Sequence, residues 1–154
     1  MFLSIGIVLP ILFHAFKVKG DIWLPIYTGA MLASFYLPLY MVLPLAISIP
    51  ILNNLLTNMP AFKPFPAMQY LILELIVLSV AVFIFHNAFG RKAISVFITA
   101  LIAILLARLS SIILVPFFDK LTIQWWINHL VVGIPGIIFN YVVTVLMKGV
   151  IDRK

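Results

Sequence analysis

Apolar stretches separated by short polar breaks run along the whole chain. The breaks carry charges, glycines or prolines and fall at residues 17–21, 58–66, 86–92, 116–120 and 148–154. A helix that crosses the hydrocarbon core of a bilayer needs about 20 mostly apolar residues. The uncharged stretch 22–62 is about twice that length, so we expect it to form two helices that fold back on each other. The turn between them is best placed at Pro38, because proline disfavours a continuous helix. The pattern predicts spans over residues 2–16, 22–37, 39–57, 67–85, 93–115 and 125–147.

Composition strengthens the expectation of a membrane protein. Of 154 residues, 65% are hydrophobic and 9% are charged, and the mean hydropathy is +1.26. A soluble domain is about half apolar and a quarter charged. The net charge of +6 does not indicate a nucleic-acid partner, because the basic residues stand at the ends of apolar runs, as membrane-flanking charges do. We therefore predict an all-α, integral membrane six-helix bundle that forms one domain over residues 1–154, with its first helix retained.

The distribution of basic residues favours one orientation by a small margin. Six crossings place both termini on the same side of the membrane. With that side as the cytoplasm, the positive-inside rule is satisfied. The inner cations are then Arg91, Lys92, Lys148, Arg153 and Lys154, and the outer ones are Lys17, Lys19, Lys63 and Lys120.

Two charges fall inside predicted spans and need an explanation. Burying a charge at the middle of a membrane helix costs roughly 2.5 to 3.5 kcal/mol on insertion scales. Glu74 and Arg108 both lie about 10 to 12 Å below the outer rim, at about 1.5 Å per residue. They can pair with each other and fix helix packing, or they can line a ligand site where Arg108 offers donors to a carboxylate or carbonyl.

Other polar side chains gather in the same outer half of the bundle. They are Trp23, Tyr27, Asn53, Asn54, Asn128 and His129, while Asn140 and Tyr141 lie deeper. His129, Gly133, Gly136 and Asn140 share one face of the last span. A channel would be polar through its full depth, so a blind pocket open to the outside fits better.

The second span carries a strip of small residues, at Gly29, Ala30, Ala33 and Ser34. Small residues four apart let helices approach closely. This strip either packs inside the bundle or docks another membrane subunit, and the sequence does not separate the two.

Several kinds of chemistry are disfavoured. The chain has no cysteine, so thiol nucleophiles and thiolate metal sites are excluded. It contains none of the common hydrolase, zinc-protease or phosphate-loop motifs. His14, His86 and His129 are spread over different helices, which disfavours a shared metal site. We expect that the chain binds no cofactor and is not an enzyme.

Four segments resemble the substrate-binding S components of energy-coupling factor (ECF) transporters. They are Pro10 with Leu12-Phe13-His14 before Gly20 and Leu24-Pro25-Ile26-Tyr27; Leu55-Leu56-Thr57-Asn58-Met59-Pro60; Glu74 before a long apolar helix; and Gly133-Ile134-Pro135-Gly136-Ile137-Ile138-Phe139-Asn140. The last segment is the most specific.

The resemblance implies a vitamin-uptake subunit in a prokaryotic plasma membrane. The ligand would enter from outside under a lid formed by residues 17–21 and 58–66. Its partners would be a transmembrane coupling subunit and two cytoplasmic ATPase subunits, and the chain would topple to release the ligand. The ligand-binding residues would be Glu74, Arg108, Trp23, Tyr27, Asn54, Asn128, His129 and Asn140.

Two other functions stay open at this point. One is a membrane-embedded enzyme that uses Glu74, Arg108 and His129 on a lipid or isoprenoid substrate. The other is an assembly subunit of a larger membrane complex. The ligand is equally open: an aromatic, partly charged vitamin fits the tryptophan, tyrosine and arginine, and a porphyrin fits histidine or tyrosine ligation.

Overall fold

The computed structural model describes residues 1–18, 20–60, 66–90 and 93–151, and its regular structure within these ranges is helical. The elements are α1 (Phe2–Ala15), α2 (Gly20–Trp23), α3 (Pro25–Tyr36), α4 (Leu39–Thr57), α5 (Ala67–Phe89), α6 (Ala93–Ser110), the 3-10 helix η1 (Ser111–Phe117), α7 (Ile123–Val132) and α8 (Ile134–Ile151). The basic residues Lys19, Lys63, Arg91, Lys92, Arg153 and Lys154, used above for orientation, lie outside the described residues.

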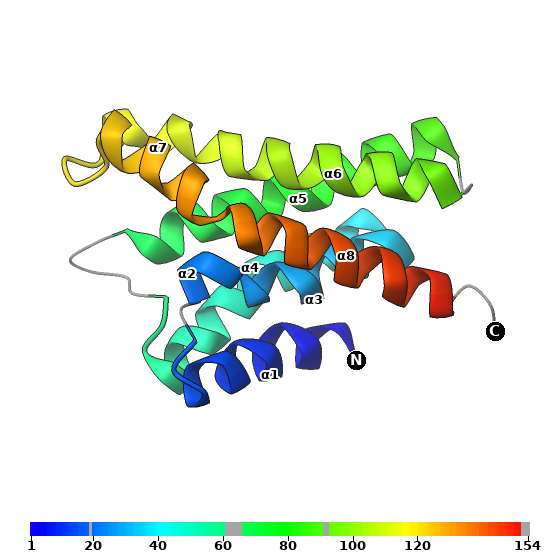
Figure 1. Cartoon of the computed structure of the whole chain (residues 1–154), viewed down its shortest axis with the longest axis horizontal. Helices are drawn as coiled ribbons and strands as arrows, with labels where there is room; N and C mark the ends of the chain where they lie inside the picture. Colours follow the sequence, from blue (N-terminus) through cyan, green and yellow to red (C-terminus); the bar gives the residue numbers. More distant parts are fainter. Residues whose placement is uncertain (19, 61–65, 91–92, 152–154) are drawn as a thin grey trace.

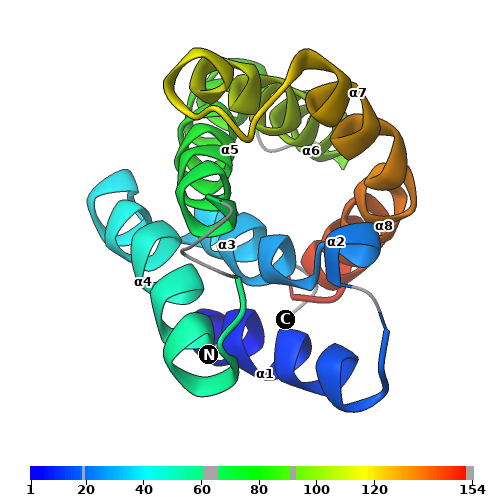
Figure 2. The ribbon, with the colours of Figure 1, turned by 90° about the vertical axis from the view of Figure 1, so that its left-hand side faces the viewer.

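The long helices run side by side along the longest axis of the molecule (Figure 1). Seen from the α7 end, α5, α6, α7, α8 and α3 surround a centre, and α1 and α4 lie on the far side of α3 (Figure 2). Helix α3 is therefore central, and every residue from Pro25 to Phe35 is buried. Both termini lie toward the end opposite α7 (Figure 1).

Several helices are long and apolar enough to cross a membrane. In the described part of the chain these are α4, α5 and the continuous segment Ile94–Phe117, and α7 with α8 makes a fourth if the pair, bent by 45°, is one span. Helices α1 and α3 have 14 and 12 residues. They extend only about 21 and 18 Å, short of a core about 30 Å thick. The long apolar helices indicate a multi-pass membrane protein.

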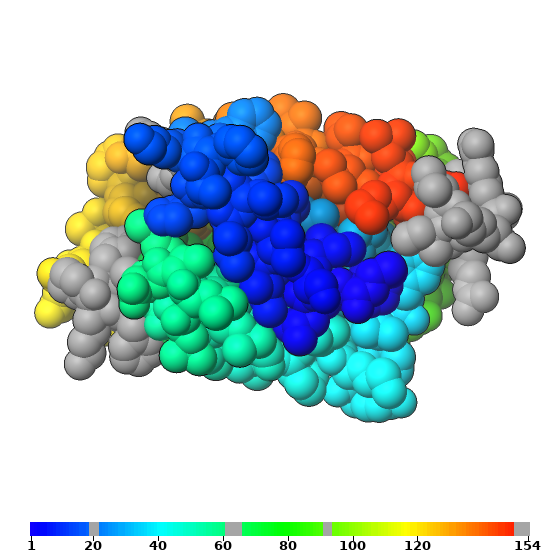
Figure 3. Space-filling view, turned by 90° about the horizontal axis from the view of Figure 1, so that it is seen from below, coloured from blue at the N-terminus to red at the C-terminus, as the bar shows by residue number. Residues whose placement is uncertain are grey.

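The exposed surfaces of α1 and α4, which lie on the outside of the bundle, are apolar. Helix α1 lies across one face beside α4 (Figure 3). Large exposed hydrophobic side chains on these two helices include Val8, Leu12, Ile51 and Leu55. In water such a surface would aggregate, whereas lipid chains cover it without penalty.

Two predicted spans are each broken within two residues of a proline. The expected helix over 22–37 is interrupted at Leu24, which has left-handed backbone angles (φ 50°, ψ 47°), and α3 begins at Pro25. The predicted last span is interrupted at Gly133, and Pro135 stands in the first turn of α8. Proline fits a first turn but not a helix interior, because it lacks an N–H and its ring clashes with the preceding turn.

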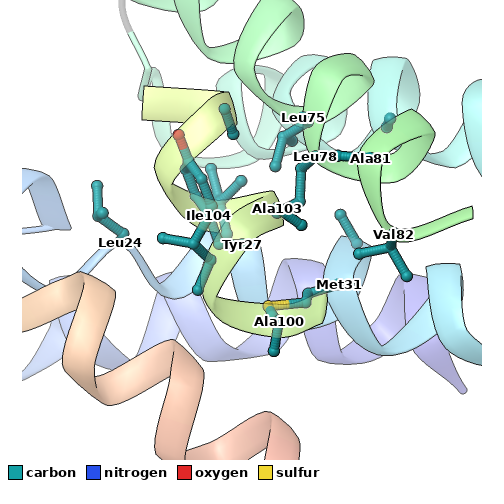
Figure 4. Close-up of a cluster of buried hydrophobic side chains, with 14 of the residues drawn as sticks. Leu24, Tyr27, Met31, Leu75, Leu78, Ala81, Val82, Ala100, Ala103 and Ile104 are labelled. Carbon is teal, nitrogen blue, oxygen red and sulfur yellow. The ribbon is translucent and has the colours of Figure 1, made fainter. Parts of the chain in front are cut away.

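The core lies between α3, α5 and α6. Leu75, Leu78, Ala103 and Ile104 surround Tyr27 and Met31 (Figure 4). Alanines at 100, 103 and 107, all 0% exposed, let α6 approach its neighbours closely. Side chains therefore fill the centre of the bundle toward the end opposite α7.

The small-residue strip of α3 packs inside the bundle. Gly29, Ala30, Ala33 and Ser34 are all buried, so the prediction that they dock a partner subunit is wrong for this surface. A Cβ built on Gly29 would lie 2.6 Å from the backbone of Gly6 in α1. The strip is small because α1 and α3 touch backbone to backbone there.

We expect Gly29→Ala to destabilise the bundle by about 1 to 3 kcal/mol, because the added methyl group forces two backbones apart. Thermal unfolding of the detergent-solubilised protein measures the effect as a lower Tm. Gly149→Ala is the matched control, since a Cβ at Gly149 meets nothing within 4 Å. Equal Tm values for the two variants would contradict the close α1–α3 packing.

Candidate ligand-binding site

The buried carboxylate of Glu74 connects α5 to three other helices. Glu74 is 0% exposed. Tyr27 of α3 donates its phenolic O–H to Oε2, and Nη1 of Arg108 lies 3.3 Å from the same oxygen. Nε2 of His129 on α7 lies 2.9 Å from Oε1. The ion pair that the sequence allowed between Glu74 and Arg108 is therefore present, and Tyr27 and His129 complete the same group.

Arg108 also closes the end of α7. Its Nη2 donates to the carbonyl of His129 in the last turn of α7, which also accepts from the backbone N–H of Gly133 at 3.2 Å. A Cβ on Gly133 would lie 2.5 Å from Nη2, so only glycine allows the guanidinium to sit against this backbone. Arg108 is 1% exposed, and its Nε has no hydrogen-bond partner among the described residues.

A cavity of ≈ 930 Å³ lies next to this charged group, at the α7 end of the bundle. Its walls come from the end of α1 on one side and from α5, α6 and α7 on the other, and the start of α3 lies between them (Figure 2). The polar side chains in its lining are His14, Lys17, Tyr27, Thr57, Tyr70, Arg108 and His129. Glu74 does not line the cavity and lies behind three side chains that do.

Aromatic rings cover both sides of the cavity. Tyr70 and Trp125 pack on His129, with ring centroids 4.8 and 4.9 Å away, and the Trp125 ring is stacked on the imidazole. Phe13 and His14 of α1 line the opposite wall. Flat side chains on two opposing walls suit a flat ligand.

Both segments expected to form a lid reach the cavity. Lys17 and Val18 line it from the end of α1, and Met59 and Pro60 line it after α4. Residues 61–65, the middle of the second predicted lid segment, lie outside the described residues.

Three of the predicted ligand-binding residues lie away from the cavity. Trp23 is 38% exposed and packs edge-on against Phe139. Asn128 is exposed and accepts a bond from Gln124 of the same helix. Asn54 donates to the carbonyl of Pro60 at 2.8 Å and so holds the chain that follows α4. The structure does not bring these three side chains to the cavity, because sequence position gives depth along a helix but not the direction of the side chain.

Asn140, also predicted to bind the ligand, does not line the cavity and instead bonds to other parts of the protein. Its Oδ1 accepts from Thr28, and its Nδ2 lies within 3.2 Å of the carbonyls of Trp23, Leu24 and Gly136. These carbonyls belong to the break between α2 and α3 and to the first turn of α8. Inside a membrane such groups need partners from the protein.

Sequence reasoning missed several lining residues. Phe13 and His14 of α1 and Tyr70 of α5 line the cavity but are not among the predicted ligand-binding residues. Tyr70 stands four residues before Glu74, so helical spacing places both on one face of α5. Among the described residues, no three His, Cys, Asp or Glu side chains gather as a metal site would require.

Comparisons of the chain with known protein families, curated proteins and solved structures find no match. Function is therefore inferred from the geometry of the site and from the residues themselves.

We expect Arg108→Gln to destabilise the protein by about 3 to 5 kcal/mol, because it leaves the buried Glu74 carboxylate without its ion-pair partner. The double variant Glu74→Gln, Arg108→Gln removes both charges and should recover much of that loss. Chemical denaturation in detergent measures both. Lys120→Gln, at an exposed cation of the same end, is the control and should leave the unfolding free energy nearly unchanged. Equal losses for the single and double variants would contradict a coupled pair.

Proposed function

We propose that this chain captures a small solute from outside the cell in the cavity at its α7 end, as the substrate-binding subunit of an ATP-driven importer of the ECF type. The observation that carries the proposal is the cavity of ≈ 930 Å³ with Arg108, Tyr27 and His129 in its lining. Small-molecule sites have volumes of about 300 to 1,000 Å³ and are mostly apolar with a few placed polar groups. The family resemblance of the four sequence segments supports the same function.

The closed centre of the bundle supports capture rather than conduction. Beyond the cavity, Met31, Leu78, Val82 and Ile104 are each 0% exposed and fill the space between α3, α5 and α6. A bound solute therefore cannot pass to the opposite end while the helices keep this packing. Release on that side requires the subunit to tilt or its helices to move apart.

The topology that goes with this function has six passes, with both termini in the cytoplasm. Helices α1 and α3 are then short passes, and α2 extends the second one toward the outer surface. Short apolar helices are accommodated by local thinning of the bilayer at modest cost. The cavity, Lys17 and Lys120 lie at the outer end in this orientation, and Lys148 lies near the inner end.

The energy for uptake comes from partners in this proposal. The sequence has no glycine-rich phosphate-binding loop, so ATP hydrolysis falls to two cytoplasmic ATPase subunits that act through a transmembrane coupling subunit. Because the strip on α3 is buried, the coupling subunit has to dock on another, outward-facing helix surface.

Native mass spectrometry of the detergent-purified chain, expressed in rich medium, tests capture directly. We expect a bound small molecule in the wild type and at least tenfold lower occupancy in Ala67→Trp. Ala67 lines the cavity without contacting the charged group, so a tryptophan there fills the binding space and leaves the Glu74 pairings intact.

Asn128→Ala is the matched control, because Asn128 is exposed at the same end and away from the cavity. It should retain the wild-type occupancy. A wild type that carries no small molecule from several media, or equal occupancy in Ala67→Trp, would contradict capture and favour the enzyme or assembly functions.

A further inference from the structure

We infer that the solute is a flat aromatic carboxylate, with its carboxylate at the first turn of α3 beside Arg108 and its ring between the α1 wall and the α5–α7 wall. This inference rests on the proposed capture function and names the chemical class of the ligand. It follows from the helix start, the spare donors of Arg108, the local charge and the aromatic walls.

The first turn of α3 is a buried helix start at the cavity. Leu24, Pro25, Ile26 and Tyr27 all line the cavity and are all buried. The first N–H groups of a helix have no acceptor within it, and the helix dipole gives them partial positive charge. Proline has no N–H, and the N–H of Tyr27 bonds to the Leu24 carbonyl at 3.0 Å. The amide of Ile26 is the donor that this turn offers to a bound anion.

Arg108 supplies the second set of donors. A guanidinium has five N–H groups. Two of its nitrogens are engaged, Nη1 with Glu74 and Nη2 with the His129 carbonyl, and Nε has no hydrogen-bond partner among the described residues. Because Arg108 is 1% exposed and lines the cavity, its remaining donors need a polar group that enters with the ligand.

The net formal charge of the residues around the cavity matches a ligand with a single negative charge. Of the described residues, the cations Lys17 and Arg108 line it, and Glu74 behind them is the carboxylate. The formal balance is two positive charges against one negative charge, or +1, with His14 and His129 counted as neutral. A single carboxylate on the ligand neutralises this balance. A phosphate dianion would exceed it and would ask for more donors than Ile26 and Arg108 provide.

The walls favour a flat ring on that carboxylate. Phe13 and His14 stand on α1, and Tyr70 and His129 stand on α5 and α7 across the cavity. His129 is itself held in place by the Trp125 ring at 4.9 Å and by Glu74 at 2.9 Å. An aromatic ring between such walls gains stacking contacts that a sugar or an aliphatic chain lacks.

Paired probes of equal shape test the charge requirement. Binding of 2-naphthoate and of its neutral analogue 2-naphthamide is measured by calorimetry on purified, ligand-stripped protein. We expect the wild type and Asn128→Ala to bind the acid about tenfold to a hundredfold more tightly than the amide, as charge-assisted hydrogen bonds predict. Equal affinities, or preference for the amide, would overturn the inference.

Two variants test whether Arg108 binds the ligand or only supports the fold. Glu74→Gln leaves the Arg108 charge without a protein carboxylate, so its preference for the acid over the amide should rise above that of the wild type. The stability-matched double variant Glu74→Gln, Arg108→Gln should lose the preference. An Arg108 that only supports the fold would leave the acid-to-amide ratio unchanged in both variants, and that result would overturn the inference.

If neither naphthyl probe binds, the chemical identity of the co-purified solute tests the inference instead. A carboxylate on an aromatic ring, identified by mass spectrometry of the extracted solute, would support the inference. A neutral or cationic solute would overturn it and leave the capture function standing. Absence of any co-purified solute together with absence of probe binding would overturn both.

Discussion

The buried carboxylate of Glu74 joins four helices. Much of the remaining structure follows from its need for a counter-charge and hydrogen-bond donors inside the bundle. An ionised group away from water needs a counter-charge and hydrogen bonds, or folding becomes unfavourable. Arg108 brings the counter-charge from α6, Tyr27 a hydroxyl from α3, and His129 a ring nitrogen from α7. Arg108 reaches its place because Gly133 has no side chain, and the break between α7 and α8 presents a carbonyl to the same guanidinium. This charged group at the α7 end thereby contributes Tyr27, Arg108 and His129 to the lining of the cavity.

The second constraint is the break between α2 and α3, where backbone carbonyls inside the bundle lack the regular bonding of a continuous helix. Asn140 supplies donors to the carbonyls of Trp23 and Leu24, and Thr28 binds the remaining oxygen of its amide. With these groups satisfied, α3 can begin at Pro25 in the middle of the protein rather than at its surface. A helix start buried at this depth faces the cavity instead of water, which is why an anion can use it.

The two ends of the bundle differ in what their buried polar groups do. At the cavity end, side chains from different helices meet one another. Toward the opposite end, Ser34 and Ser79 bond to carbonyls one turn earlier in their own helices, at Ala30 and Leu75. These two hydroxyls are satisfied within their own helices. In the proposed function, a solute held at the cavity end can therefore reach the opposite end only if helices move.

The sequence by itself determined the membrane class and the all-α composition, and it marked Glu74 and Arg108 as charges at equal depth inside apolar spans, because hydrophobic length and the cost of a buried charge are local properties. It placed α4 over its full length and located α5 at its start. Only the tertiary structure decided which polar side chains face the cavity. Trp23, Asn54 and Asn128 have the right depth but point elsewhere, and Phe13, His14 and Tyr70 line the site without any charge to mark them. The rotation of each helix about its axis depends on packing against its neighbours, and helices α3 to α6 are too uniformly apolar for their own sequences to fix that rotation.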